Sequence, residues 1–105
     1  MIFKESETVE FKTSTAELKE AVISISAILN KRGKGELYFG IRDYGTVVGQ
    51  MIGKETLRDI TEAISTHLEP KIFPQLRVRK IRGKDCIHIE FHGIIVRILP
   101  TAGLT

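Results

Sequence analysis

The alternation of hydrophobic and polar residues predicts strands towards both ends of the chain. Val9 and Phe11 alternate with polar neighbours, so a strand is expected over residues 7–12. Further along, hydrophobic residues alternate with charged ones or with histidine over residues 76–79 and 87–92, on either side of an Arg-Gly-Lys-Asp sequence. Because such a sequence favours a chain reversal, the second pattern predicts a β-hairpin.

Helical spacing of apolar residues predicts two helices between these strands. Residues 15–31 repeat large aliphatic side chains every three or four positions, behind Ser14 and Glu17, which are spaced as in a capping box. Gly33 follows, and glycine commonly ends a helix because it adopts the left-handed conformation. A second amphipathic helix is expected over residues 54–68, ended by a proline two positions later.

The segment between the two helices predicts another hairpin. Hydrophobic alternation over residues 37–42 is followed by Asp-Tyr-Gly, after which extended character resumes over residues 46–49. The order of elements is then strand, helix, hairpin, helix, hairpin. This order predicts an α+β two-layer sandwich, in which a mixed, mostly antiparallel sheet has two helices on one face. The other face of the sheet is expected to be polar.

Composition limits the chain to a few classes of protein. A length of 105 residues with 42% hydrophobic residues suits one domain, and a net charge of +3 permits an anionic partner. Cys86 is the only cysteine, so no internal disulfide can form and a reducing compartment is expected. The N-terminal residues lack the apolar core of a signal peptide, and no stretch approaches the roughly 18 apolar residues of a membrane span. We therefore expect a cytoplasmic protein without membrane contact.

Positive charge is concentrated late in the chain. Residues 70–84 contain six Lys and Arg residues and no acidic residue. Such a run is either a solvated surface or a contact for a nucleic-acid backbone, and Arg77 and Arg79 fall on one face of the predicted strand. We predict phosphate contacts to DNA or RNA from two groups of residues: Arg77, Arg79, Lys80 and Arg82 in this run, and Lys12, Lys31, Arg32 and Lys34 nearer the N-terminus.

Three acidic residues form a second candidate site. Glu5 and Glu10 are separated by five positions, which would place them on opposite faces of an unbroken strand, so they converge only if the chain bends before Thr8. In that case Glu5, Glu10 and Asp43 supply the hard oxygen ligands that Mg²⁺ or Mn²⁺ prefers, and such an ion can stabilise phosphodiester cleavage. The alternative is that all three are ordinary surface carboxylates.

The Gly-Lys-Gly sequence at residues 33–35 lacks the arrangement of a phosphate-binding P-loop. In a P-loop the glycines follow a strand and open a helix, whereas here they follow a predicted helix and precede a strand. No Ser or Thr follows Lys34 either. The simpler interpretation is a helix end and a tight turn.

Two histidines flank an acidic residue on the last predicted strand. His88, Glu90 and His92 alternate there, so their side chains share one face. A metal site at this point would need further ligands from a neighbouring strand. We interpret the three as solvated strand residues.

Taken in order, four segments resemble a known family. Residues 5–12, 27–30, 35–41 and 43–49 together are similar to the Schlafen AlbA_2 domain, also called the divergent AAA-4 family, which occurs in many bacterial and archaeal proteins described as transcriptional regulators. The resemblance covers about residues 4–93. It implies an Alba-like α+β fold and a nucleic-acid-binding domain, often the N-terminal module of a longer regulator.

The resemblance also implies an activity for the acidic residues. In nuclease-active Schlafen proteins two glutamates and an aspartate form a metal-dependent RNA-cleaving site, and these correspond to Glu5, Glu10 and Asp43, with Mg²⁺ or Mn²⁺ as the implied cofactor. Some relatives carry an ATP-binding label, for which the Gly-Lys-Gly sequence gives no support. The functional alternatives are thus nucleic-acid binding, RNA cleavage, and a protein-interaction or oligomerisation module.

The last residues depart from the family pattern. After Gly93 the family usually continues with a Pro-Tyr-x-Ala-Tyr-Gly-Arg stretch, but here residues 94–105 read differently, and codons compatible with them can encode a similar stretch in another frame. We therefore expect a domain over residues 1–93 and an atypical tail, from truncation or a frameshift, over residues 94–105. Loss of the final strand would expose a sheet edge and favour homo-oligomers.

Overall fold

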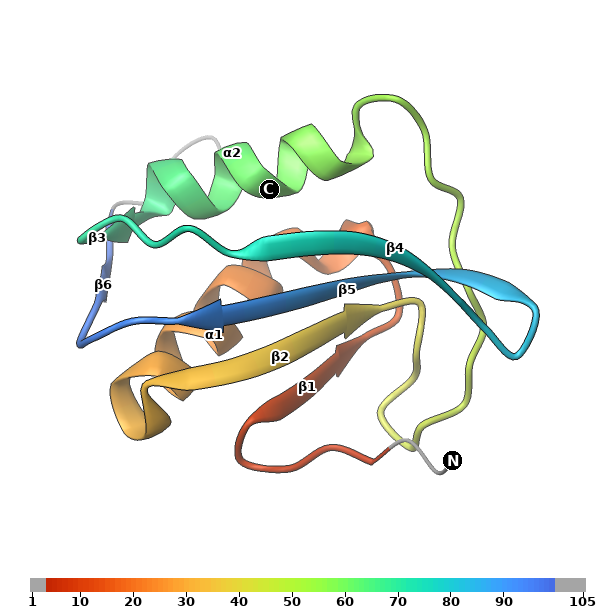
Figure 1. Ribbon diagram of the computed structural model, residues 1–105, viewed down its shortest axis with the longest axis horizontal. Helices are drawn as coiled ribbons and strands as arrows, with labels where there is room; N and C mark the ends of the chain where they lie inside the picture. Colours follow the sequence, from red (N-terminus) through yellow and green to blue (C-terminus); the bar gives the residue numbers. More distant parts are fainter. Residues whose placement is uncertain (1–3, 100–105) are drawn as a thin grey trace.

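The computed structural model describes residues 4–99 of the chain (Figure 1). In order, the elements are β1 (Val9–Lys12), a 3₁₀ turn (Thr15–Glu17), α1 (Leu18–Arg32), β2 (Lys34–Phe39), α2 (Thr56–His67), β3 (Leu68–Glu69), β4 (Gln75–Ile81), β5 (Lys84–His92) and β6 (Arg97–Ile98). Both predicted helices and the late hairpin are confirmed. Among the described residues, no helix has the length and apolar character needed to cross a membrane.

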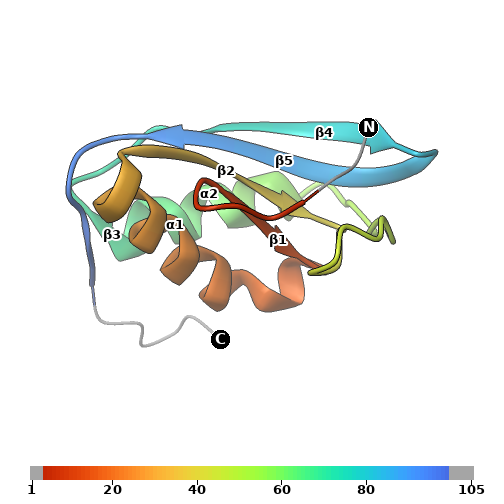
Figure 2. The same cartoon turned by 90° about the horizontal axis from the view of Figure 1, so that it is seen from below.

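The main sheet has the strand order β1-β2-β5-β4. β1 runs parallel to β2, with α1 as the connection between them, and the other two pairs are antiparallel. Figure 2 shows α1 and α2 together on one face of this sheet. The structure therefore confirms an α+β fold with a mixed, mostly antiparallel sheet and two helices on one face. A small second sheet pairs β3 with β6.

The main core lies between the helices and the sheet. Leu37 and Phe39 on β2, and Ile87 and Ile89 on β5, are completely buried in it. Each pair is two residues apart on its strand, so both members point to the same face of the sheet. Burial of these alternating residues against α1 and α2 provides much of the driving force for the two-layer arrangement.

The ends of α1 follow the predicted signals. The side chain of Ser14 accepts a hydrogen bond from Ala16 N, and the carboxylate of Glu17 accepts one from Thr13 N at 2.8 Å. At the other end, Gly33 has a φ of 77° and donates its N–H to Leu29 O. These contacts satisfy backbone groups that a helix end would otherwise leave unpaired.

The face of the sheet opposite the helices is only partly polar, so the expectation of a polar face was wrong at one end. A second hydrophobic cluster lies there, in which Phe11 and Cys86 are fully buried and Ile41 and Val47 contribute from the segment after β2. This segment covers that end of the sheet because Gln50 N donates to Asp85 O near the start of β5. The remainder of this face, which we call the open face, carries polar side chains.

The predicted hairpin over residues 37–49 was right in its reversal and wrong in its second strand. Arg42 N donates to Thr46 O at 2.9 Å, so the chain does turn. However, Ile41 and Val47 form only an isolated bridge, and β2 takes β1 and β5 as its partners. Gly40, with a φ of 102°, turns the backbone so that its carbonyl accepts from residues 48 and 49.

The described part of the predicted tail packs against the rest of the domain. Val96 is only 2% exposed, and its N–H donates to Asn30 Oδ1 at 2.7 Å. β6 follows and pairs with β3. Residues 100–105 of the expected tail lie outside the described residues. A truncated or frameshifted origin remains a prediction that sequencing of the locus would test.

Candidate functional site

A tight turn brings Glu5 back alongside β1. Ser6 and Val9 exchange backbone hydrogen bonds of 3.0 and 3.4 Å, so the chain bends at residues 7 and 8. This is the bend that the spacing of the two glutamates required. β1 is an edge strand, and Glu5 Oε2 accepts a hydrogen bond from Phe11 N at 2.9 Å, in the place where a further strand would bind.

The three predicted carboxylates lie near one another. The pKa of Glu5 is raised above 4.5, first because burial disfavours its charge and then because the carboxylates of Glu10 and Asp43 repel it. A hydrogen bond between the side chains of Glu5 and Glu10 adds to the rise, whereas the bond from Phe11 N opposes it. A carboxyl group whose pKa is raised by burial and by neighbouring carboxylates is a common feature of cation-binding and catalytic sites.

Lys12 belongs to this acidic cluster. Its Nζ lies 3.1 Å from Glu10 Oε2, and its side chain is only 14% exposed. Lys12 is thus a partner of Glu10 on the helix side of β1. Its ammonium neutralises part of the negative charge that the three carboxylates bring together.

The donor chemistry of the cluster suits Mg²⁺ or Mn²⁺, which prefer carboxylate oxygens. Yet within residues 4–99 no group of three or more His, Cys, Asp or Glu side chains stands in position to hold a metal ion. Glu10 and Asp43 both lie near enough to Glu5 to raise its pKa, so the three carboxylates would have to move closer together to share one ion. Asp43 lies in the turn at residues 42–46, and every residue of this turn except Gly45 is exposed.

The late basic residues lie on the β4–β5 hairpin. Arg77 and Arg79 pair in register with His88 and Cys86, so they share the open face, as predicted. Arg79 Nη1 donates to Tyr38 Oη at 3.3 Å. Lys80, whose side chain is 69% exposed, lies 3.6 Å from Asp85. Such long, exposed pairs contribute little to stability.

The early basic residues divide between two places. Lys31 and Arg32, at the end of α1, both form ion pairs with Glu7 in the N-terminal turn. Lys34 is exposed at the start of β2, opposite His92 on β5. Of this group, Lys34 is the one that joins the open face of the sheet.

Sequence reasoning missed the role of His88. The interpretation of a solvated residue was wrong, because His88 is 6% exposed, its Nε2 lies 2.7 Å from Glu36 Oε1, and its ring stacks on Tyr38 at 4.4 Å. The contact joins residues that are 52 positions apart. Only the β2–β5 register, which places Tyr38 opposite His88, reveals it.

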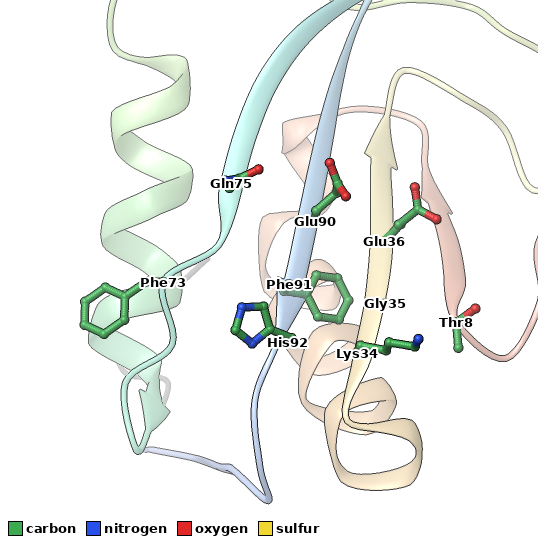
Figure 3. Close-up of a pocket in the computed structure, with 9 residues that line it drawn as sticks. All are labelled: Thr8, Lys34, Gly35, Glu36, Phe73, Gln75, Glu90, Phe91 and His92. Atoms are coloured by element: carbon green, nitrogen blue, oxygen red, sulfur yellow. The ribbon is translucent and has the colours of Figure 1, made fainter.

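The open face also contains a cavity of about 500 Å³ (Figure 3). It lies over β2, β5 and the start of β4, away from the helices. The residues that line it are Thr8, Lys34, Gly35, Glu36, Phe73, Gln75, Glu90, Phe91 and His92. Sequence patterns gave no sign of this cavity, because its residues come from four separate segments.

Fold and surface together define a class: an α+β domain whose helices cover one face of a sheet and whose other face bears a basic hairpin and a cavity. The chain matches the family model of the Schlafen AlbA_2 domain over residues 5–98, and it belongs to that family. The resemblance drawn from the sequence is thereby confirmed. A search of the curated proteins found no match.

Solved structures share the fold. One is the N-terminal domain of a RecG-related protein from Nitrosomonas europaea, with 19% identity and a TM-score of 0.63 over 87% of this chain and 66% of that one. Another is the DIP2311 protein from Corynebacterium diphtheriae, with 18% identity and a TM-score of 0.70 over 95% of this chain. The chain spans only 23% of that second structure. At these identities the likeness concerns the fold alone.

Proposed function

We propose that this domain binds nucleic acid through the β4–β5 hairpin. The observation that carries the proposal is the basic run on this hairpin, where Arg77, Arg79, Lys80, Arg82 and Lys84 occur with no acidic residue among them. Arg77 and Lys80 have side chains that are 60% and 69% exposed, so both can reach a phosphate.

One structural neighbour is the N-terminal domain of a protein described as ATP-dependent DNA helicase RecG-related. We extend the proposal to a module of a prokaryotic transcriptional regulator that works in the cytoplasm on DNA or RNA. The unpaired thiol of Cys86, which is buried, agrees with a reducing compartment.

Binding can be measured by fluorescence anisotropy with single- and double-stranded DNA and RNA. The combined substitution Lys80→Gln and Arg82→Asn should weaken binding about tenfold or more at low salt, because two phosphate contacts are lost. Asparagine is chosen at position 82 because Arg82 has a φ of 50°, which asparagine tolerates.

The matched control is the combined substitution Lys19→Gln and Arg58→Gln, which also removes two positive charges. Both residues are exposed in the helix layer, Lys19 on α1 and Arg58 on α2, so the control changes the net charge by the same amount without touching the hairpin. Equal losses from the control and from the hairpin variant would mean that only net charge matters. Absence of binding to every oligonucleotide would overturn the proposal.

A second candidate function is divalent-metal-dependent cleavage of RNA, for which the specific observation is the Ser6–Val9 turn, which returns Glu5 to β1 near Glu10 and Asp43. Glu5 and Glu10 would hold Mg²⁺ or Mn²⁺, with Asp43 completing the set. A bound ion would supply a Lewis acid for the scissile phosphate. The chain's own part is to keep the two glutamates together through the Ser6–Val9 turn.

Cleavage of labelled RNA with and without Mn²⁺ tests this second function. Glu10→Gln should abolish cleavage and weaken binding of Mn²⁺ alone, measured by calorimetry. Glu62→Gln, on the exposed surface of α2, should leave both unchanged. Cleavage that persists in the Glu10 variant would point to a contaminant or another site.

A further inference from the structure

We propose that the cavity on the open face binds a guanine base of single-stranded nucleic acid. The inference rests on the nucleic-acid binding proposed above and adds to it a preference for one base. It follows from three properties of the cavity: its place beside the basic hairpin, the hydrogen-bonding groups on its floor, and an exposed aromatic ring at its rim.

The position and size of the cavity suit one nucleotide. Its volume of about 500 Å³ falls in the range of about 300–1,000 Å³ that is usual for small-molecule sites. Gln75 and Arg77 are two residues apart on β4, so the cavity begins where the basic run begins. A strand whose phosphates follow Arg77 and Arg79 would therefore bring a base to the cavity, and Lys34 on the far wall is placed for the next phosphate (Figure 3).

Two carboxylates face each other on the floor of the cavity. Glu36 on β2 and Glu90 on β5 are direct partners in the antiparallel register. Like charges in this position destabilise a sheet. His88 compensates Glu36 through its 2.7 Å contact, whereas Arg77 approaches Glu90 only to 4.0 Å. Glu90 therefore keeps acceptor capacity, and a ligand that donates hydrogen bonds would relieve the repulsion.

A donor lies directly beside this acceptor. Gln75 is the register partner of Glu90 on the other side, and Figure 3 shows Gln75, Glu90 and Glu36 on neighbouring strands. Arg77 Nη2 donates to Gln75 Oε1 at 3.1 Å, which occupies the carbonyl end of the amide. The Nε2 end of Gln75 is left to donate. Arg77 thus acts as a positioning residue for both Gln75 and Glu90.

Guanine fits this arrangement better than the other bases. Its Watson–Crick edge presents two adjacent donors, N1–H and the N2 amino group, followed by the O6 acceptor. The carboxylate of Glu90 can accept from both donors, and Gln75 Nε2 can donate to O6. Adenine and cytosine offer only one donor group on this edge, and uracil offers one donor between two acceptors. Each of these bases would therefore leave one oxygen of the Glu90 carboxylate facing an acceptor.

Aromatic and basic side chains complete the site. Phe73 is 87% exposed and stands at the rim two residues before Gln75, so its ring is free to stack on a base. His92 extends from β5 towards the loop that carries Phe73 (Figure 3). A base stacked on an aromatic ring typically gains about 1–3 kcal/mol, so Phe73 would provide affinity while Glu90 and Gln75 provide selectivity.

The test compares labelled oligouridines that carry one central guanosine, inosine or adenosine, titrated by fluorescence anisotropy against the whole chain. Inosine keeps N1–H and O6 and lacks only the N2 amino group. We expect guanosine to bind about 5- to 100-fold more tightly than inosine or adenosine, which is the usual discrimination of a two-donor contact. Glu90→Gln should remove this difference, and Glu62→Gln should preserve it.

The outcomes distinguish the guanine preference from the nucleic-acid binding on which it rests. If all three oligonucleotides bind equally, the base preference is refuted and nucleic-acid binding stands. If none binds, the proposal of nucleic-acid binding is refuted. A titration with guanosine and inosine monophosphates, followed by NMR, then tests the guanine site by itself. Shifts of the Gln75 side-chain amide that occur only with the guanosine form support the site, and their absence refutes it. The inosine comparison needs no variant, so a misfolded Glu90→Gln protein leaves the test intact.

Discussion

At the scale of single residues, Glu5 is the most informative titrating group. Its pKa is raised above 4.5, chiefly by burial and then by Glu10 and Asp43. A carboxyl group with a raised pKa binds its proton more tightly in the folded state, so its contribution to stability is fully present below pH 4.5 and is lost as the pH rises through its folded pKa. The folded protein therefore resists mild acid better than an unshifted carboxylate would allow.

Glu5→Gln should remove this pH dependence. The amide can still accept the bond from Phe11 N but cannot ionise, so the variant should gain in melting temperature relative to the wild type as the pH rises from below 4.5 to neutral. Thermal melts followed by circular dichroism at several pH values measure the difference. Glu62→Gln corrects for the change in net charge, and a gap between wild type and Glu5→Gln that stays constant with pH would contradict the prediction.

Individual residues also show how far the sequence could predict the candidate site. The spacing of Glu5 and Glu10 defined the bend that their convergence requires, and the Ser6–Val9 turn provides it. The partner of His88 could not be predicted, because it depends on which strands are neighbours. Pairing of β2 with β5 brings Glu36 and His88 together across 52 positions, and no local pattern encodes that choice.

At the scale of elements, close packing between β2, β1 and α1 depends on Gly35. A Cβ at this position would lie 2.5 Å from Ile28 Cγ2 and 2.9 Å from Thr8 O. Gly35→Ala should therefore destabilise the domain by about 1–3 kcal/mol, since the helix and the edge strand must move apart. Urea unfolding followed by circular dichroism measures the change.

Gly53→Ala is the matched control for that substitution. The nearest atom to a Cβ there is Thr56 Oγ1 at 3.9 Å, and the backbone needs no left-handed conformation. Its effect should stay within about 0.5 kcal/mol of the wild type, as for most surface substitutions. Similar losses from both variants would show that glycine flexibility, and not the contact with Ile28, explains the effect.

Elements with strong periodicity were predictable, and elements defined by distant contacts were not. The helical repeat and its caps located α1 to within a few residues, and the alternation around residues 82–85 located β4 and β5. β3 and β6 have only two residues each, and the sequence did not predict them. They form because the end of the described chain lies beside the residues that follow α2, which is a contact between distant segments.

At the scale of the whole molecule, charge distribution matters more than net charge. A value of +3 is small for a protein that binds a polyanion. The exposed surfaces of α1 and α2 mix both signs, with Lys19 beside Glu20 and Arg58 beside Asp59. Residues 75–84 include basic residues and no acidic residue. Positive charge is therefore concentrated on the β4–β5 hairpin, and we expect a nucleic acid to approach there and not at the helices.

This distribution predicts the salt dependence of binding. If Arg77, Arg79, Lys80 and Arg82 each contact one phosphate of a single strand, the logarithm of the binding constant should fall with the logarithm of the salt concentration at a slope of about −3, since each contact contributes about −0.7. Lys80→Gln should reduce the magnitude of that slope by about 0.7, whereas Arg58→Gln in the helix layer should leave it unchanged. Anisotropy titrations over a range of salt concentrations measure the slope. A slope that is the same for both variants would mean that the nucleic acid does not follow the hairpin, and it would direct attention to Lys31 and Arg32 at the end of α1.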